Sequence, residues 1–121
     1  MSDVTSQAGN NAPANLHNLE EQFGQETARE LVRAYLEDTE EVLENMQTAI
    51  LGRDPKVLKP LAHMLKTASR IIGATELSQY SVEMENLCAE GQNNWLSVES
   101  FFEKFSASFQ ATTNYLRQYL Q

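Results

Sequence analysis

Residues 61–77 read LAHMLKTASRIIGATEL, and the spacing of their apolar side chains decides how this part of the chain folds. At about 100° per residue, the apolar and small side chains in and just before this run fall on one face of a helix. That face consists of Leu58, Leu61, Ala62, Leu65, Ala68, Ser69 and Ile72. His63 lies almost opposite to it. The stretch therefore predicts an amphipathic helix that packs its apolar face on a core and exposes His63.

The outward face around His63 is basic, although the whole chain is acidic. Five of the nine lysines and arginines lie between positions 53 and 70, in a chain of net charge −8. They are Arg53, Lys56, Lys59, Lys66 and Arg70. Like charges three or four residues apart destabilise a helix by roughly 0.2–0.5 kcal/mol per pair. An anionic group on or against His63 would relieve this repulsion. An ordinary solvent-exposed histidine remains the alternative.

The run that begins at His63 resembles the motif of the histidine-containing phosphotransfer (HPt) domains of multistep phosphorelays. In that family the phosphorylated histidine opens the pattern H-x-L-K-G-S/A-S/A-x-x-hydrophobic-G-A-x-x-L, followed by a small residue and then by a hydrophobic residue with glutamate. The matching positions are His63, Leu65, Lys66, Ala68, Ser69, Ile72, Gly73, Ala74, Leu77, Ser81, Met84 and Glu85. Thr67 departs from the pattern, because the family usually has glycine or another very small residue there. Its side chain narrows the approach to the imidazole or forms a hydrogen bond near it.

The resemblance implies a phosphorelay intermediate that accepts a phosphoryl group on His63 from a receiver phosphoaspartate and passes it to the aspartate of another receiver. It implies response-regulator receiver domains and a hybrid sensor kinase as partners, with Mg²⁺ held by the receiver and no cofactor or metal held by this chain. Neutral imidazole is a good nucleophile near pH 7. We assign Lys66 and Arg70 to stabilising the charge of the transferring phosphoryl group, and Lys59 to a weaker share in this role and to partner binding. Gly73 is better explained as a helix end than as a site residue.

A second flank lies beside the histidine on the same predicted helix. Met64, Thr67 and Ile71 belong neither to the apolar face nor to the basic one. Either a neighbouring helix covers them, or they form an exposed apolar patch that binds a helix of the receiver.

The first half of the chain predicts a tail, a short helix and a long helix. Residues 1–15 are mostly small and polar and predict a flexible tail. A helix over 16–23 ends at Gly24, and a helix over 25–51 ends with Gly52 as its C′ residue. The inward side of the long helix consists of Ala28, Leu31, Val32, Tyr35, Thr39, Val42, Met46 and Ile50, and its outer face is acidic.

Asp54 and Pro55 predict the start of the helix that carries His63, and Pro60 predicts a kink or a split near that start. Thr75 is the expected cap of a helix over 76–90, with Leu77, Tyr80, Ser81, Met84, Leu87 and Cys88 facing inward and Gly91 ending it. Ser97 is the expected cap of a last helix that reaches about Tyr119, with an inward stripe of Val98, Phe101, Phe102, Phe105, Phe109, Thr112, Leu116 and Tyr119. We therefore predict an all-α domain over 16–121, an antiparallel up-down-up-down four-helix bundle with a short extra N-terminal helix.

Composition limits the classes of function. A chain of 121 residues with 41% hydrophobic residues has room for a single core, and no apolar run is long enough for a signal peptide or a membrane span. The lone cysteine, Cys88, excludes an internal disulfide and a multi-thiolate metal site. A pI near 4.6 argues against nucleic-acid binding. We expect a cytoplasmic monomer, and we give His17 no functional role.

Two other functions compete with this prediction. The residues from His63 to Thr67 also look like the phosphoacceptor helix of a sensor kinase, but Met64 and Ala68 stand where that pattern has an acidic residue and a proline. No phosphate-binding glycine loop is present either, so we expect no ATP-dependent kinase activity. The second competitor is a non-catalytic HPt-like module that binds a receiver without accepting phosphate.

Overall fold

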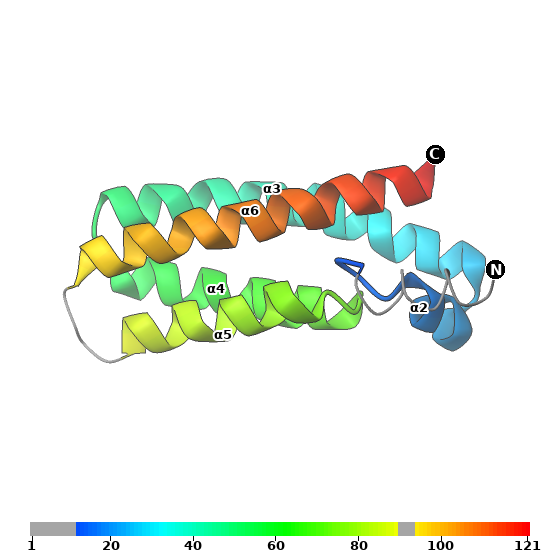
Figure 1. The fold of residues 1–121 in the computed structure, drawn as a ribbon, viewed down its shortest axis with the longest axis horizontal. Helices are drawn as coiled ribbons and strands as arrows, with labels where there is room; N and C mark the ends of the chain where they lie inside the picture. The colour runs from blue at the N-terminus through cyan, green and yellow to red at the C-terminus, as the bar shows by residue number, and fades with distance from the viewer. Residues whose placement is uncertain (1–11, 90–93) are drawn as a thin grey trace.

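The computed structural model describes residues 12–89 and 94–121, and within these ranges the chain forms helices and no strands. The helices are α2 (Leu16–Phe23), α3 (Gln25–Leu51), α4 (Pro55–Ile71), α5 (Thr75–Ala89) and α6 (Trp95–Leu120). The predicted all-α class is confirmed. Helix α4 packs on α3 and α5, and α6 packs on α5 and α3, so the four long helices close a ring. Successive long helices run in opposite directions, and α2 lies at one end (Figure 1).

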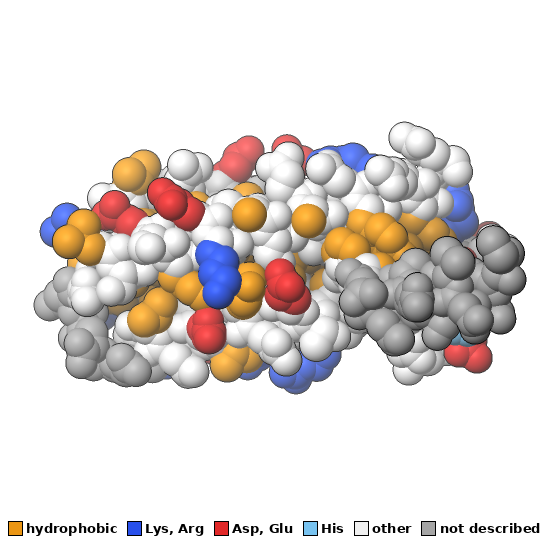
Figure 2. Space-filling model, viewed as in Figure 1, with side chains coloured by type: hydrophobic (Ala, Val, Ile, Leu, Met, Phe, Trp, Pro, Cys, Tyr) orange, Lys and Arg blue, Asp and Glu red, His pale blue; other side chains and the backbone are white. Residues whose placement is uncertain are grey.

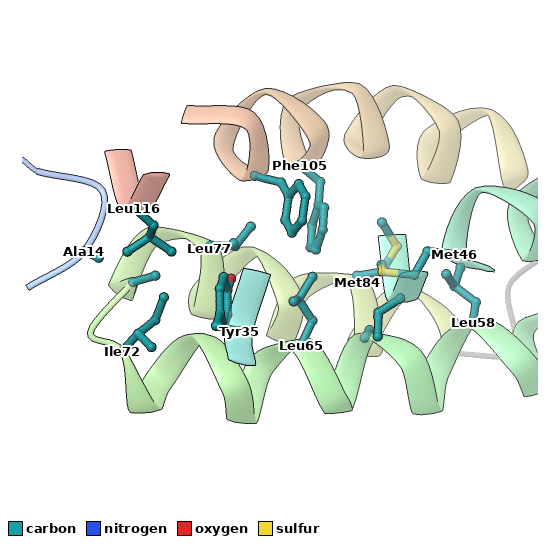
Figure 3. Close-up of a cluster of buried hydrophobic side chains, with 14 of the residues drawn as sticks. Ala14, Tyr35, Met46, Leu58, Leu65, Ile72, Leu77, Met84, Phe105 and Leu116 are labelled. Carbon is teal, nitrogen blue, oxygen red and sulfur yellow. The ribbon is translucent and has the colours of Figure 1, made fainter. Parts of the chain in front are cut away.

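The core lies along the axis of this ring, where the apolar sides of the four long helices meet (Figure 3). Leu65 of α4, Met46 of α3, Met84 of α5 and Phe105 of α6 are each completely buried. Every residue predicted to face inward from these helices is buried or half-buried. The periodicity of apolar side chains therefore predicted the core correctly.

Helix α4 is continuous at Pro60, so the predicted split is wrong, while the predicted kink stays a prediction. Asp54 caps the helix by accepting a hydrogen bond from the Val57 N–H at 3.3 Å, and Pro55 occupies the first turn. Helix α4 then continues through Pro60 to Ile71. The proline removes only the hydrogen bond that its own N–H would make to the Lys56 carbonyl, and its ring is exposed. The cap and the following turns hold the helix together.

The turn between α4 and α5 depends on Gly73, as predicted. Gly73 has a φ of 75°, its N–H donates to the Arg70 carbonyl at 3.1 Å, and the Ala74 N–H donates to the Ser69 carbonyl at 2.8 Å. These two bonds form a Schellman motif. The Asn15 N–H also donates to the Gly73 carbonyl at 3.1 Å, and a Cβ at Gly73 would lie 3.0 Å from the Asn15 Cβ. Glycine is therefore required both by the backbone angle and by the close approach of Asn15.

This contact corrects the predicted limit of the N-terminal tail. Residues 1–11 lie outside the described residues, but Ala14 is buried in the core cluster and Asn15 is bonded to the α4–α5 turn. The prediction that a flexible tail extends to residue 15 is wrong at its end. Residues 12–15 form part of the packed domain.

Helices α2 and α3 both form hydrogen bonds with the C-terminal end of α6. The Tyr119 hydroxyl donates to Glu20 Oε2 at 2.6 Å, and burial together with this acceptor raises the pKa of Tyr119 to about 12. The Arg29 guanidinium donates to the carbonyls of Tyr119 and Leu120 at 3.2 and 2.8 Å. The two Arg29 contacts satisfy carbonyl groups in the last turn of α6, which have no partner within the helix.

The bounds of α3 are confirmed, but the residue in the left-handed position after it and the predicted starts of α5 and α6 differ from the structure. Gly52 is right-handed, with a φ of −84°, and Arg53 takes the left-handed position after α3, with a φ of 52°. Helix α6 begins at Trp95 rather than after Ser97, because Asn94 is the cap and accepts from the Ser97 N–H at 3.2 Å. Helix α5 begins at Thr75, so Thr75 is its first residue and not its cap. The predicted stop at Gly91 lies outside the described residues.

Candidate functional site

His63 lies on the outward side of α4, as its phase predicted. Its side chain is 59% exposed, while Leu65 and Ala62 on the opposite side are fully buried. The face formed by α5 and α6 carries isolated charged side chains among hydrophobic and uncharged ones (Figure 2). The five basic residues that cluster in the sequence lie in the α3–α4 turn and in α4.

A carboxylate from α5 joins His63 to Lys66. His63 Nδ1 lies 3.1 Å from Glu85 Oε2, and Lys66 Nζ lies 3.0 Å from Glu85 Oε1. The exposed fraction is 20% for the Lys66 side chain and 16% for that of Glu85, so this ion pair is largely shielded from water. His63, Lys66 and Glu85 thus form one connected cluster, which we call the His63 site.

Close packing of α4 on α5 places Glu85 at this site. The Ser78 hydroxyl of α5 donates to the Lys66 carbonyl of α4 at 3.4 Å, and Ser81, one turn before Glu85, is fully buried. Met84, the neighbour of Glu85 in sequence, points into the core (Figure 3). Glu85 therefore emerges at the edge of the interface, next to the outward face of α4.

The electrostatics of the His63 site define which imidazole nitrogen is free. Partial burial acts to raise the pKa of Glu85, but the hydrogen bonds and positive charges of Lys66 and His63 outweigh it and hold this pKa below its usual value. Glu85 is therefore ionised at neutral pH and can only accept hydrogen bonds. The hydrogen-bond network consequently assigns the proton of the neutral imidazole to Nδ1, which leaves the lone pair on Nε2.

Sequence reasoning gave Glu85 no role, although the motif contains it. It also treated Lys66 as a cation free to meet a phosphoryl group, whereas the structure pairs Lys66 with Glu85. A carboxylate 22 residues after the histidine, beside an inward-facing methionine, was the available signal. Reading it required knowing how α5 packs on α4.

The other predicted cations do not contact His63 in the structure. Arg70 is exposed and lies two turns beyond His63, about 10 Å along the helix axis. Lys59 is exposed, one turn before His63. Burial of the Cys88 thiol raises its pKa, and the positive charge of Lys59 partly offsets this rise. Lys59 and Cys88 lie together in a cleft of about 370 Å³ between α4 and α5, which is also lined by Pro55, Lys56 and Pro60.

The flank beside His63 is exposed. Met64 is 54% and Ile71 is 52% exposed, and Thr67 is exposed between them. In the part of the chain that the structure describes, no neighbouring helix covers these residues, so that alternative is wrong. Val57, which is 46% exposed, extends the same ridge by one more heptad towards the start of α4.

Other chemistry is not evident in residues 12–89 and 94–121. No group of three or more histidine, cysteine, aspartate or glutamate side chains there is arranged to hold a metal ion. None of the described helices combines the length and the apolar character needed to cross a membrane. His17, to which we assigned no role, is exposed and pairs with Glu21 at 3.3 Å.

Comparisons with known proteins agree with the motif. Residues 30–120 match the family model of the Hpt domain. No match is found among curated proteins. The fold is similar to the crystal structure of histidine-containing phosphotransfer protein B (HptB) from Pseudomonas aeruginosa PAO1, with a TM-score of 0.79 and 24% sequence identity over 88% of this chain and 90% of that one. Because the family model covers most of its length, the chain belongs to the Hpt domain family.

Proposed function

We propose that this protein is a phosphorelay intermediate that carries a phosphoryl group on Nε2 of His63. It accepts the group from the phosphoaspartate of one receiver domain and passes it to the aspartate of another. The observation that carries the proposal is the contact between His63 Nδ1 and the ionised Glu85, because it orients an exposed imidazole with its nucleophilic nitrogen free.

The transfer follows from this arrangement. The Nε2 lone pair attacks the phosphorus atom, the bond between phosphorus and the aspartyl oxygen breaks, and the aspartate leaves as a carboxylate. The proton on Nδ1 stays in place, so the imidazole becomes positively charged as the phosphorus–nitrogen bond forms. Glu85 stabilises that positive charge from 3.1 Å. Transfer to the second receiver is the same reaction in reverse.

Lys66 and Arg70 supply positive charge for the transferring phosphoryl group. Lys66 is already ordered next to the imidazole by Glu85, and an ammonium group has three donors, so it can bind a phosphoryl oxygen without leaving the carboxylate. Arg70, on the same face, is placed to contact the receiver or the phosphoryl oxygens as the partner docks. The basic face as a whole complements the acidic residues that hold Mg²⁺ in a receiver.

The exposed flank of α4 forms the docking surface. Met64, Thr67 and Ile71 contribute an apolar ridge next to the histidine, and Lys59 borders it. This combination suits a helix of the receiver, while the hybrid sensor kinase provides the phosphate through its own receiver. In this function the protein acts in the cytoplasm as a monomeric antiparallel four-helix bundle. It needs neither ATP, nucleic acid, membrane nor a metal of its own, and the Mg²⁺ belongs to the receiver.

The alternative is a module that binds a receiver without transfer, and Thr67 beside the histidine is the feature that favours it. One experiment separates the two functions. Phosphorylated receiver domains carrying radioactive phosphate are mixed with the wild-type protein and with His63→Gln. Acid-labile label on the wild type alone supports transfer. Binding of a receiver without any label on a folded wild-type protein would support the non-catalytic module.

A further inference from the structure

Thr67 is held in one orientation beside the reactive imidazole. It follows His63 by one turn of α4 and is exposed. Its hydroxyl donates a hydrogen bond to the His63 carbonyl at 3.2 Å. Side chains in a helix lean towards its N-terminus, so the Thr67 side chain extends over the turn that contains His63.

The hydrogen bond determines which part of Thr67 meets an incoming molecule. With the hydroxyl turned back to the helix backbone, the methyl group is the part of the side chain left for contact. Threonine has few rotamers in a helix, and those with the hydroxyl on the preceding carbonyl are the favoured ones. In this rotamer the methyl group is the part of Thr67 that an incoming molecule meets.

The opposite side of the imidazole is closed as well. Glu85 occupies the Nδ1 edge, and the Lys66 ammonium is bonded to the same carboxylate. A phosphoryl donor therefore approaches His63 from the exposed side of α4, on which Thr67 lies one turn away and Met64 and Ile71 are exposed as well. A small donor can do so freely, whereas a protein donor must fit its own side chains around the methyl group.

We propose that Thr67 is a specificity-determining residue, whose methyl group selects among receiver domains by the size of the side chains that surround their phosphoaspartate. This inference rests on the proposed function, because it concerns access to His63 as the phosphoacceptor. It makes a distinction that docking alone does not: Thr67 limits transfer from proteins far more than transfer from small phosphodonors.

Three substitutions separate the methyl group from the hydrogen bond. Thr67→Ser keeps the hydroxyl and loses the methyl group, Thr67→Val keeps the branched shape and loses the hydroxyl, and Thr67→Ala loses both. Each is tested with phosphoramidate, whose phosphorus–nitrogen bond breaks and releases ammonia as the bond to His63 Nε2 forms. Each is then tested with a panel of phosphorylated receiver domains from the same organism. Circular dichroism checks that every variant is folded.

We expect substitution of Thr67 to change labelling by phosphoramidate far less than it changes transfer from receivers. With Thr67→Ser and Thr67→Ala, transfer from receivers that are poor donors to the wild type should rise about tenfold, the usual effect of one methyl group on selectivity. Thr67→Val should rank the receivers as the wild type does. Equal behaviour of the Ser and Val variants, or an unchanged ranking in Thr67→Ala, would overturn the inference.

The proposed function fails in a different way. If neither phosphoramidate nor any receiver labels His63 in the wild type, the phosphorelay role is wrong and Thr67 has no access to control. If His63 is labelled and the ranking of receivers does not depend on residue 67, the phosphorelay role stands and only the assignment of Thr67 is lost.

Discussion

Replacing Glu85 by glutamine removes one negative charge from the His63 site while keeping the size of the side chain and an oxygen that can accept a hydrogen bond. The Nδ1–H of His63 can still donate to that oxygen. The positive charge that the imidazole gains during transfer, however, no longer has a carboxylate next to it. We expect His63 to be phosphorylated more slowly in Glu85→Gln.

The size of the effect follows from the geometry. His63 Nδ1 is 3.1 Å from Glu85 Oε2, and the His63 side chain is 59% exposed. Opposite charges at such short range attract by about 1 kcal/mol in water and about 4 kcal/mol near a protein surface. High exposure of the histidine places this pair near the lower limit, at about 1–2 kcal/mol. Since about 1.4 kcal/mol corresponds to a factor of ten in rate, transfer should slow by about tenfold.

The assay is single-turnover transfer from a phosphorylated receiver, with the protein in excess and the acid-labile label measured after rapid quenching. Glu83→Gln is the matched control, because Glu83 lies on the same helix, is exposed, and lines a cleft with Phe101 of α6 instead of contacting His63. The reasoning is refuted if both variants transfer phosphate at the same rate.

The same variant gives a test by pH. The pKa of Glu85 lies below its usual value of 4.5 in the folded protein, so its pairing stabilises the fold fully above about pH 5 and is lost as the pH falls through the lower folded value. The free energy of unfolding should therefore be higher in the wild type than in Glu85→Gln at neutral pH. The difference should shrink as the pH falls below about 5. Urea unfolding at a series of pH values measures it, and a difference that grows towards low pH would contradict the pairing.

The remaining predictions concern the scaffold. Tyr35 and Ser69 share a buried hydrogen bond of 2.9 Å. Burial of Tyr35, only partly offset by that bond, raises its pKa to about 12. Because Tyr35→Phe removes the bond and leaves Ser69 buried, it should lower the free energy of unfolding by about 1–2 kcal/mol in urea titrations. An unchanged midpoint would mean that Ser69 finds another partner. Gly73→Ala should lower the melting temperature, because the φ of Gly73 is 75° and the added Cβ would meet Asn15. Gly52→Ala should instead stabilise the protein by about 0.4–1 kcal/mol, because the φ of Gly52 is −84° and the added Cβ would make only ordinary contacts with the carbonyls of Thr48 and Ala49. Equal effects at the two glycines would contradict this comparison. Arg53→Gly should raise the melting temperature, since Arg53 holds a left-handed conformation with a φ of 52°. A lower one would show that the Arg53 side chain makes a compensating contact.

The sequence predicted the helices and the core because both depend on spacing within one segment. Leu58 and Leu65 are buried and His63 is exposed for the same reason, the phase of α4. The start of α6 was predicted wrongly at Ser97, because Asn94, which can also cap a helix, was not considered. Asn94 accepts from the Ser97 N–H, and Trp95 is buried in the first turn of the helix.

The site could be predicted only in part. His63 was identified from its own helix, but Glu85 lies on α5, next to the buried Met84. Spacing along α5 places Glu85 about 100° around the helix from Met84, but it does not show that His63 of α4 lies on that side. The exposure of Met64 and Ile71 likewise depends on whether another helix packs there, which is a property of the whole bundle.

The contacts of residues 15–29 show where the packed unit of this chain begins. The Hpt family match begins at residue 30, yet Asn15 is bonded to the turn that ends the His63 helix, and Glu20 is bonded to Tyr119 at the end of α6. A fragment cut at the family boundary would lack Leu16 and Leu19, which are buried, and also Arg29, which binds the last carbonyls of α6. The packed unit of this protein therefore extends beyond the region that the family model matches, because its N-terminal segment is bonded both to the α4–α5 turn and to the C-terminal end of α6.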